Sequence, residues 1–471
     1  MNAFLRCNAR AKCGTIKGII WKKRNGKGTR VMRRIALIAL LAALLACTAS
    51  AEEKYDKIPQ ALQVSQTTQE EKISKNAVIR RMVPTTSNAQ VDEEMRQLVD
   101  ELTEKNRESL PPKPSSSAYL EVGPVITRTG TSWMSFLTLA ETAYAHELLN
   151  VDFEARVYDM ATGERISLTD VFAPESEAWD LLAREVRAQL SAAFPGEEPD
   201  ARALDALCER ENLENAAFTM SVARLSLTYR ADAVYPGRNT LLHVTLYYPD
   251  IRPLMTPRAQ AQTDNSRFKL VALTFDDGNV VGRSRRLLET LRRYGAQATY
   301  FIVGRTIRNN HDILSRLQNG GYSVQSHSYT HPYAKDLTPE KALKEKEDFA
   351  AELSAVTGIP PALMRSPGGK DEFYVHNEIG YPLIHWSVAG GDSGGTRASS
   401  VEDNVLSFVR DGDVVLLHET NENVPDYTKT ILRELAGRGY LCVTVQELFA
   451  ARGVALEPNR VYFKPTDVRD P

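Results

Sequence analysis

The side chains best suited to chemistry lie between residues 268 and 453, and most come directly after a short apolar run. Asp276 and Asp277 stand side by side in LTFDDG, at the end of KLVALTF. His327 follows YSVQS, and His331 is four residues further on. Three more polar residues hold the same place after other runs: Arg365 after PALM, Asp392 after WSVAGG, and His418 at the end of DVVLLH. Each feature alone is common, but the whole set is hard to obtain by chance.

These residue types favour a metal-assisted reaction. Imidazole nitrogen and carboxylate oxygen suit zinc, and His-x-x-x-His on a helical turn presents both rings on one face. Successive residues of a strand point to opposite sides, so one of Asp276 and Asp277 can bind the ion while the other acts as a base. Three protein ligands with an open position are typical of catalytic rather than structural zinc. The charge of the ion would also help to keep two neighbouring carboxylates ionised.

The elements that must position these residues alternate between strands and helices. SRRLLETLRRYG, HDILSRLQNGG, TPEKALKEKEDFAAELSAVTG and TKTILRELAGRGY predict helices, and they separate apolar runs such as ATYFIVG and LCVTVQE. This alternation predicts an α/β fold with a parallel sheet, for which a barrel is the favoured form. In such barrels the chemistry sits at the carboxyl ends of the strands. The polar residues would therefore converge on one rim.

Five stretches now occur in a recognisable order: TFDDG (274–278), HSYTH (327–331), RSPGG (365–369), WSVAGGDS (386–393) and LLH (416–418). They resemble the five motifs of the carbohydrate esterase family 4 polysaccharide deacetylases. GAQATYFIVG (295–304) is similar to the second strand of that family. The resemblance covers residues 268–453 and implies a distorted (β/α)7 barrel. It also implies removal of acetyl groups from N-acetylglucosamine units, or sometimes of O-acetyl groups from xylan.

The resemblance implies a role for each matching residue. Asp276 is similar to the general base of the family, and His418 to its general acid. Arg365 resembles the arginine that orients the base, and Asp392 the supporting aspartate of the fourth motif. The ligands of a Zn²⁺ ion, or of Co²⁺ or another divalent metal, would be Asp277, His327 and His331.

The substrate-binding residues implied by the resemblance are Gly368, Leu416 and Trp386. Leu416 would line the pocket for the acetyl methyl group, and a backbone N–H near Gly368 would assist at the acetyl oxygen. The family usually carries an aromatic residue where Gly368 stands, an aspartate at Ala389 and a tryptophan at Ser393. The sequence therefore predicts a groove with less stacking surface. Three aromatic residues are candidate replacements: Tyr333, Tyr374 and Trp386.

The remainder of the chain predicts an accessory region. Residues 118–256 alternate strand patterns such as NVDFEARVYD with one helical pattern, which indicates a smaller α+β domain. Its GERISLTDVF turn and Tyr-rich last strand weakly resemble the extracytoplasmic α+β domain of secreted cell-wall proteins and lysozyme-sensing anti-sigma factors. Residues 52–117 are expected to be a linker, disordered except for one helix over 91–110. Residues 257–267 are expected to be a second linker, and 454–471 a C-terminal tail.

The N-terminus predicts export. Residues 1–51 combine basic residues, the apolar run IALIALLAALLA and an Ala-Ser-Ala site, as secretory signal peptides do. Met32 is a more natural start for such a signal, which makes the stretch before it an upstream extension. An uncleaved membrane anchor is one alternative, although the run is short for a span of ~20 residues. A lipoprotein leader ending at Cys47 is another, although Leu45 is bulky for a lipobox.

Charge and cysteine content narrow the function further. The chain has 471 residues, and residues 1–51 hold 11 of its 58 Lys and Arg but no Asp or Glu, so the mature chain has 47 basic and 60 acidic residues and a net charge of −13. An acidic chain is a poor nucleic-acid binder, since phosphate affinity comes from Lys and Arg. Cys208 and Cys442 would remain, either as a disulfide or as free thiols.

These patterns favour a secreted or cell-wall-associated deacetylase of peptidoglycan N-acetylglucosamine. Chitin-like oligomers, exopolysaccharide and acetylxylan are alternative substrates. A wall-binding protein that has lost catalysis is a second reading, motivated by the altered third and fourth motifs. A glycosidase is a third, but its paired carboxylates flank a sugar ring at ~5–9.5 Å, and it leaves the histidines without a role.

Overall fold

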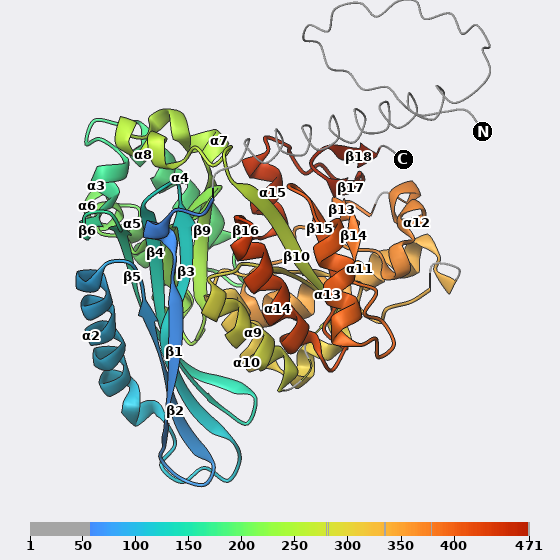
Figure 1. The fold of residues 1–471 in the computed structure, drawn as a ribbon, viewed down its shortest axis with the longest axis horizontal. Coiled ribbons are helices and arrows are strands. Elements are labelled where there is room, and N and C mark those ends of the chain that lie inside the picture. Colours follow the sequence, from blue (N-terminus) through green and yellow to red (C-terminus); the bar gives the residue numbers. More distant parts are fainter. Residues whose placement is uncertain (1–56, 279, 281, 334–335, 378, 470–471) are drawn as a thin grey trace, which may run out of the picture. The chain divides into compact units, whose positions relative to one another are not determined.

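The computed structural model describes residues 57–469 except 279, 281, 334–335 and 378 (Figure 1). The leader expected over residues 1–51 therefore lies outside the described residues. The described residues belong to one compact unit. Of the helices in the described part, not one combines the length and apolar content that a bilayer crossing requires.

A six-stranded sheet comes first. Its strands follow the order β1–β2–β3–β4–β5–β6 and are antiparallel except for the parallel pair β2–β3. Their bounds are Ser65–Lys72, Ala77–Thr85, Ala118–Thr129, Trp133–Tyr144, Glu147–Asp159 and Glu164–Ile166. Helix α2 (Ala89–Asn106) makes the crossover from β2 to β3, and the side chain of Asn88 accepts two backbone N–H groups of its first turn. Val91, Met95 and Leu102 bury α2 against one face of the sheet.

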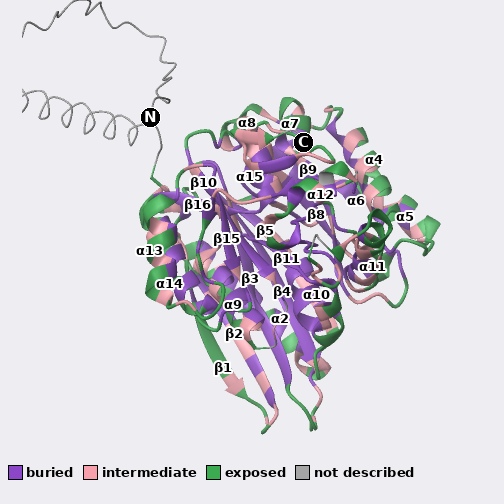
Figure 2. Ribbon diagram, turned by 90° about the vertical axis from the view of Figure 1, so that its right-hand side faces the viewer, coloured by how far each residue is buried: buried purple, intermediate pink, exposed green. Residues whose placement is uncertain are grey.

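The sequence does not predict part of this layer. The helix expected over 91–110 corresponds to α2, but the segment 52–117, expected otherwise as a linker, also contributes β1 and β2 to the sheet. Strand β1 reads SQTTQEEK, and Gln66 is its one buried residue. Figure 2 shows β1 as a largely exposed strand. An edge strand needs no apolar face, so β1 carries no alternating signal for sequence reasoning to detect.

A smaller antiparallel sheet follows, made of β7 (Phe218–Met220), β8 (Arg224–Arg230) and β9 (Leu241–Tyr247). The helices around it are α3 (Leu168–Val171), α4 (Ala178–Ser191), α5 (Ala201–Leu207), α6 (Arg210–Glu214), α7 (Tyr248–Ile251) and α8 (Pro257–Gln262). Leu182 and Val186 of α4 pack with Leu227 and Val244 of the sheet. The expected α+β region is therefore present, and α8 occupies the start of the segment 257–267, which was expected as a linker.

A parallel sheet forms the C-terminal part, in the order β12–β11–β10–β15–β14, with β16 also paired to β10. The bounds of β10, β11, β12, β14, β15 and β16 are Lys269–Asp277, Thr299–Ile302, Ser323–Ser326, Val388–Ala389, Val414–His418 and Tyr440–Val443. Met364 bridges β12 to β13 (Leu383–Ile384). Strand β13 pairs with β17 (Val461–Lys464), and β17 with β18 (Asp467–Arg469). Residues 454–471, expected as a tail, thus contribute two strands.

Helices separate these parallel strands, as the sequence predicts. They are α9 (Arg283–Tyr294), α10 (His311–Asn319), α11 (Pro339–Thr357), α12 (Asp371–His376), α13 (Ala398–Phe408), α14 (Val424–Gly437) and α15 (Val445–Ala451). The expected α/β class with a parallel sheet is confirmed, while closure into a distorted (β/α)7 barrel stays a prediction. Cys208 and Cys442 are both free thiols, which decides between the two alternatives for them.

The six-stranded sheet and the parallel sheet share one core, with α9 and α10 between them (Figure 1). Val125 and Leu137 of the first sheet pack in the same cluster as Leu287 and Leu291 of α9 and Leu314 of α10. A buried ion-pair cluster joins the same elements and consists of Glu121, Glu141, Arg292 and Arg316. The N-terminal sheet therefore packs against α9 and α10, which in turn pack against the parallel strands.

Candidate active site

The carboxyl end of β10 brings Asp276 and Asp277 to the centre of the candidate site. In the parallel ladder, Asp276 pairs with Phe301 of β11 on one side and with His418 of β15 on the other. Strand pairing alone therefore places two distant motifs at the same edge of the sheet. Asp276 is buried and Asp277 is half-buried.

The two aspartates face one site, although strand alternation would separate them. The backbone turns into the left-handed region at Asp277, with φ of 73°, and stays there at Gly278, with φ of 70°. A Cβ atom at Gly278 would lie 2.4 Å from Cγ2 of Ile302, so only glycine fits this turn. As a result, one oxygen of Asp276 and one of Asp277 lie 3.7 and 3.8 Å from Nε2 of His327.

Asp277, His327 and His331 form a candidate divalent-cation site. One ligand atom from each lies within 4.8 Å of the other two. Oδ1 of Asp277 is 3.8 Å from Nε2 of both histidines. The Nδ1–H of His327 donates to the carbonyl oxygen of Arg365 at 2.9 Å, which leaves Nε2 as the ligand atom. Two imidazoles, one carboxylate and a backbone partner that fixes the ring fit zinc or a similar ion.

The electrostatics at His327 suit a metal ligand. Burial lowers the pKa of His327, and the negative charges of Asp276 and Asp277 offset this effect only in part. The ring is therefore neutral at physiological pH. Neutral imidazole is the form that binds metal ions, so no proton needs to be displaced from His327 when an ion enters.

Arg365 holds the buried carboxylate of Asp276. Its Nη1 donates to Oδ1 of Asp276 at 2.6 Å and to Oγ1 of Thr274 at 2.7 Å. Its Nε and Nη2 donate to the carbonyl oxygens of Ile384 and His385 at 2.9 and 3.0 Å. The guanidinium is thereby fixed by four acceptors, and Oδ2 of Asp276 is left on the side of the histidines.

Asp392 holds His418 in a second network. Nδ1 of His418 lies 2.8 Å from Oδ1 of Asp392, and the backbone N–H of His418 donates to Oδ2 at 2.6 Å. The Tyr427 hydroxyl also donates to Oδ2 at 2.6 Å, and the side chain of Asn421 donates to the Asp392 carbonyl at 2.7 Å. Asp392 and Tyr427 are buried, so this network fixes the imidazole of His418 through its Nδ1.

Two residues that support this site could not be predicted from the sequence. Tyr427 lies on α14, nine residues after His418, and Glu345 lies on α11, fourteen residues after His331. Glu345 accepts hydrogen bonds from the loop that joins the two histidine ligands. Both sit inside ordinary helical patterns, in which the sequence gives no signal that one polar side chain faces the site.

The residues predicted to bind substrate differ in their exposure. Gly368 has φ of 64°, and a Cβ atom there would have no atom within 4 Å, so space opens at the position where the family resembled usually carries an aromatic side chain. Leu416 is buried, and Trp386 is half-buried and stacked on His385 with ring centroids 3.9 Å apart. A Cβ at Gly369 would lie 2.9 Å from the Trp386 ring. The RSPGG turn thus rests against this stack.

The aromatic candidates for sugar stacking also differ in their exposure. Tyr333 is 72% exposed and follows the metal-ligand candidate His331 by two residues. Tyr374, by contrast, is 0% exposed and packs in the cluster that contains Met364 and Leu383. Tyr374 is a core residue, so its candidacy as a stacking surface is wrong. Its ring is buried among residues that are distant in the sequence, so the sequence around it does not reveal its burial.

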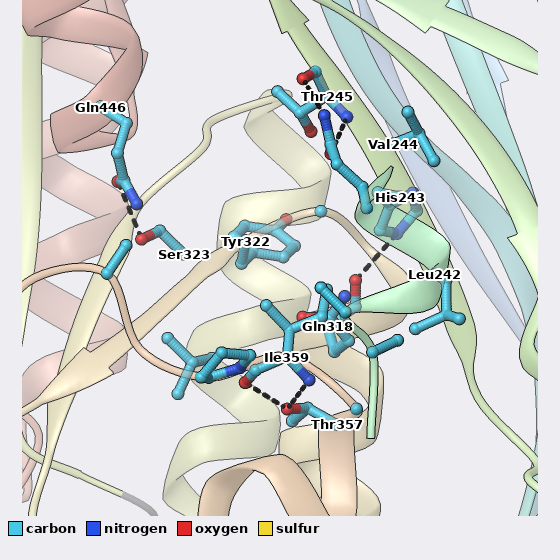
Figure 3. Close-up of a pocket in the computed structure, with 18 of the residues that line it drawn as sticks. Leu242, His243, Val244, Thr245, Gln318, Tyr322, Ser323, Thr357, Ile359 and Gln446 are labelled. Carbon is cyan, nitrogen blue, oxygen red and sulfur yellow. Dashed lines mark hydrogen bonds between the residues drawn. The ribbon is translucent and has the colours of Figure 1, made fainter. Parts of the chain in front are cut away.

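A cavity of about 460 Å³ lies away from this site (Figure 3). It is lined by β9 and α4 of the accessory region and by α10, α11 and β12 of the parallel-sheet region. His243 lines it, but its ring contacts Thr228 and the carbonyl of Gln318, and burial lowers its pKa to about 4. None of the predicted catalytic or metal-binding residues reaches this cavity. It belongs to the packing between the two regions.

Comparison with known proteins agrees with this geometry. Residues 263–382 match the family model described as polysaccharide deacetylase. The chain is 33% identical over 201 residues to the peptidoglycan-N-acetylglucosamine deacetylase PgdA of Listeria monocytogenes, and the match spans 43% of this chain and 42% of that protein. It is 32% identical over 193 residues to a peptidoglycan-N-acetylglucosamine deacetylase of Bacillus cereus, spanning 38% of this chain and 88% of that protein.

A solved structure adds a further likeness. The Xyl-CE4 domain of a multidomain xylanase from the hindgut metagenome of Trinervitermes trinervoides is 30% identical. The match covers 42% of this chain and 98% of that domain, with a TM-score of 0.40. Because the chain covers most of the Bacillus cereus relative at more than 30% identity, the family assignment is secure. This chain belongs to the polysaccharide deacetylase family, through its C-terminal region.

Proposed function

We propose that this protein is a metal-dependent polysaccharide deacetylase that hydrolyses the N-acetyl groups of peptidoglycan N-acetylglucosamine. One observation carries the proposal. The Arg365–Asp276 pair, the cation site and the Asp392–His418 pair meet at the carboxyl ends of neighbouring strands. A base, a cation site and an acid around one point suit metal-assisted hydrolysis of an amide.

In the proposed reaction each proton moves in a defined direction. Oδ1 of Asp276 is occupied by Arg365, so Oδ2 takes the proton from the attacking water. Nδ1 of His418 is held by Asp392, so Nε2 gives its proton to the departing sugar nitrogen. A divalent ion held by Asp277, His327 and His331 would polarise the acetyl carbonyl as a Lewis acid. The water oxygen bonds to the acetyl carbon, the C–N bond breaks, and the products are acetate and a free amine on the glycan.

The substrate and location of the protein are part of the same proposal. Peptidoglycan is supported by the names of the Listeria monocytogenes and Bacillus cereus relatives. Chitin-like oligomers, exopolysaccharide and acetylxylan are the alternatives, and the open space at Gly368 favours a substrate with bulky substituents. The pattern of residues 1–51 supports export to the cell wall, with release or anchoring through that segment as the two variants.

Acetate release tests the proposal. Residues 52–471 would be incubated with N-acetylated peptidoglycan, chitooligosaccharides and acetylxylan, with added zinc or cobalt and with a chelator. Chelator-sensitive acetate from peptidoglycan is the expected result, and faster release from another glycan would reassign the substrate. Bound metal without acetate from any of the three would favour a binding role, for which the exposed Ala389 and Ser393 and the open space at Gly368 are the structural arguments.

A further inference from the structure

The loop between His327 and His331 is held in an unfavourable backbone conformation. Ser328 and His331 have φ of 63° and 61°, in the left-handed region that residues other than glycine seldom adopt. Such residues persist only where the surrounding structure enforces them. The conformation is what brings His331 back toward Asp277, so whatever enforces it also sets the distance between the ligands.

Contacts within the loop account for part of this enforcement. The N–H of Ser328 donates to Oγ of Ser326 at 3.2 Å, and the N–H of His331 donates to Oγ of Ser328 at 3.0 Å. The loop carbonyls accept from the segment after β11, since the N–H of Gly304 donates to the oxygen of Ser328 at 3.0 Å. These bonds leave the N–H groups of Tyr329 and Thr330 to be satisfied from outside.

Glu345 satisfies both of them. Its Oε2 accepts the N–H of Tyr329 at 2.8 Å and the N–H of Thr330 at 2.7 Å. Its Oε1 accepts the Thr330 hydroxyl at 2.7 Å. Within the described part of the chain, no ion pair competes for this carboxylate. Two successive backbone N–H groups that converge on one anion form a nest, and a charged acceptor makes such bonds stronger than neutral ones.

We propose that Glu345 is a positioning residue for the metal site, which clamps the loop so that His331 stands ready to bind the ion. The inference rests on the proposed function and extends it to the support of one ligand. Glu345 acts through the backbone and touches neither ion nor substrate. It comes from α11, whose Phe349 and Leu353 are anchored in the core, so the clamp ties His331 to the rigid body of the domain.

Metal affinity tests the inference without any turnover. Zinc and cobalt would be titrated into the metal-free protein by calorimetry, and the cobalt absorption spectrum would report the ligand geometry. Loss of a supporting partner typically weakens metal binding about 10- to 100-fold, which is the result expected for Glu345→Ala. Glu345→Gln keeps one oxygen for the two N–H groups and should lose less. The matched control is Glu347→Gln, an exposed acid on the same helix, which should bind like the unaltered protein.

The outcomes separate the two proposals. Unaltered affinity and an unaltered cobalt spectrum in Glu345→Ala would overturn the role of Glu345 and leave the proposed function standing. Equal losses in Glu345→Gln and Glu347→Gln would also overturn it, because the effect would then belong to the helix as a whole. If Glu345→Ala does not fold, the test is the metal affinity of Glu345→Gln compared with that of Glu347→Gln. If the unaltered protein binds no divalent ion, the proposed function itself falls.

Discussion

Nδ1 of His418 lies 2.8 Å from Oδ1 of Asp392, within a network that the Tyr427 hydroxyl completes from the other oxygen. Burial by itself lowers the pKa of His418. The hydrogen bond to Asp392 and the negative charges of Asp392, Asp276 and Asp277 outweigh burial, so the pKa is raised above its ordinary value. A raised pKa keeps the ring protonated to higher pH, which is the state that a proton donor requires.

Replacing Asp392 should shift the pH dependence of deacetylation. Asp392→Asn removes the charge and the charged acceptor, so the pKa of His418 falls. His418 then loses its proton at lower pH, and the alkaline limb of kcat/KM against pH moves to lower pH. Weakened proton donation should also reduce kcat, up to the ~10²–10⁴-fold that general acid catalysis contributes. The measurement is the rate of acetate release from pH 5 to pH 10.

The matched control for this experiment is Tyr427→Phe. It removes one donor to Asp392 but keeps the carboxylate and its charge, so the pKa of His418 should not fall. An alkaline limb that stays in place in Asp392→Asn would contradict the role given to Asp392. A limb that moves down equally in both variants would assign the effect to disturbed packing.

Arg365 should stabilise the fold as well as the site. Arg365→Met leaves the carboxylate of Asp276 buried without its cation, a change that typically costs about 3–5 kcal/mol. Arg365→Lys should cost less, because it keeps a charge but has three donors for four acceptors. Equilibrium urea unfolding in the presence of a chelator measures both, since bound metal would otherwise add to the apparent stability.

An exposed arginine gives the control for this prediction. Arg293→Met, at the end of α9, should change the free energy of unfolding by less than about 0.5 kcal/mol. A comparably small change in Arg365→Met would show that the Arg365–Asp276 pair does not stabilise the fold. That result would contradict the stabilising role given to Arg365.

Sequence reasoning located the strand-end residues of the site well, for a physical reason. In a parallel sheet the carboxyl ends of neighbouring strands meet at one edge, so Asp276, His327 and His418 converge once the strands are known. The supports on helices, Tyr427 and Glu345, do not follow from this rule. Which face of a helix meets a loop depends on how the helix packs, and packing leaves no local pattern at a single polar position.

The elements of the fold also differ in whether the sequence predicts them. Strands with an apolar face, such as β10 and β15, are visible in the sequence, whereas the polar edge strand β1 is not. Pairing of β2 with β3 across α2 is a long-range contact, and residues 454–471 become strands only because β13 offers them an edge. The relation between the accessory region and the parallel sheet is equally invisible, because it rests on side chains that meet across more than 100 residues.

The ion-pair cluster between these regions should contribute strongly to stability. Glu141 is fully buried; its Oε2 accepts from Arg292 at 3.1 Å and from Arg316 at 3.2 Å, and its Oε1 accepts from Asn319 at 3.0 Å. Glu141→Gln leaves two buried guanidinium groups with Glu121 as their one remaining carboxylate in the cluster. Breaking a buried pair in this way typically costs about 3–5 kcal/mol, which urea unfolding would register.

A surface acid provides the comparison for Glu141. Glu93→Gln removes an exposed pair with Arg96 on α2 and should lower the free energy of unfolding far less than Glu141→Gln does, because solvent screens exposed pairs. Metal affinity of folded Glu141→Gln should stay unchanged, because the hydrogen bonds of Glu141 run to α9 and α10 and none of them reaches Asp277, His327 or His331. Equal costs for the two substitutions would show that the interface between the regions is held by apolar contacts alone.

Tyr333 should contribute to glycan binding rather than to chemistry. It is 72% exposed, two residues from His331, where a sugar ring bound at the site could stack on it. Aromatic stacking is worth about 0.5–1.5 kcal/mol, so Tyr333→Ala should raise KM about two- to tenfold with kcat unchanged, as expected when ground state and transition state lose the same contact. Phe408→Ala is the matched control, because Phe408 is 68% exposed but precedes β15 and so lies at the opposite end of the strands from His418. A reduced kcat in Tyr333→Ala, or an equal rise of KM in Phe408→Ala, would count against a stacking role.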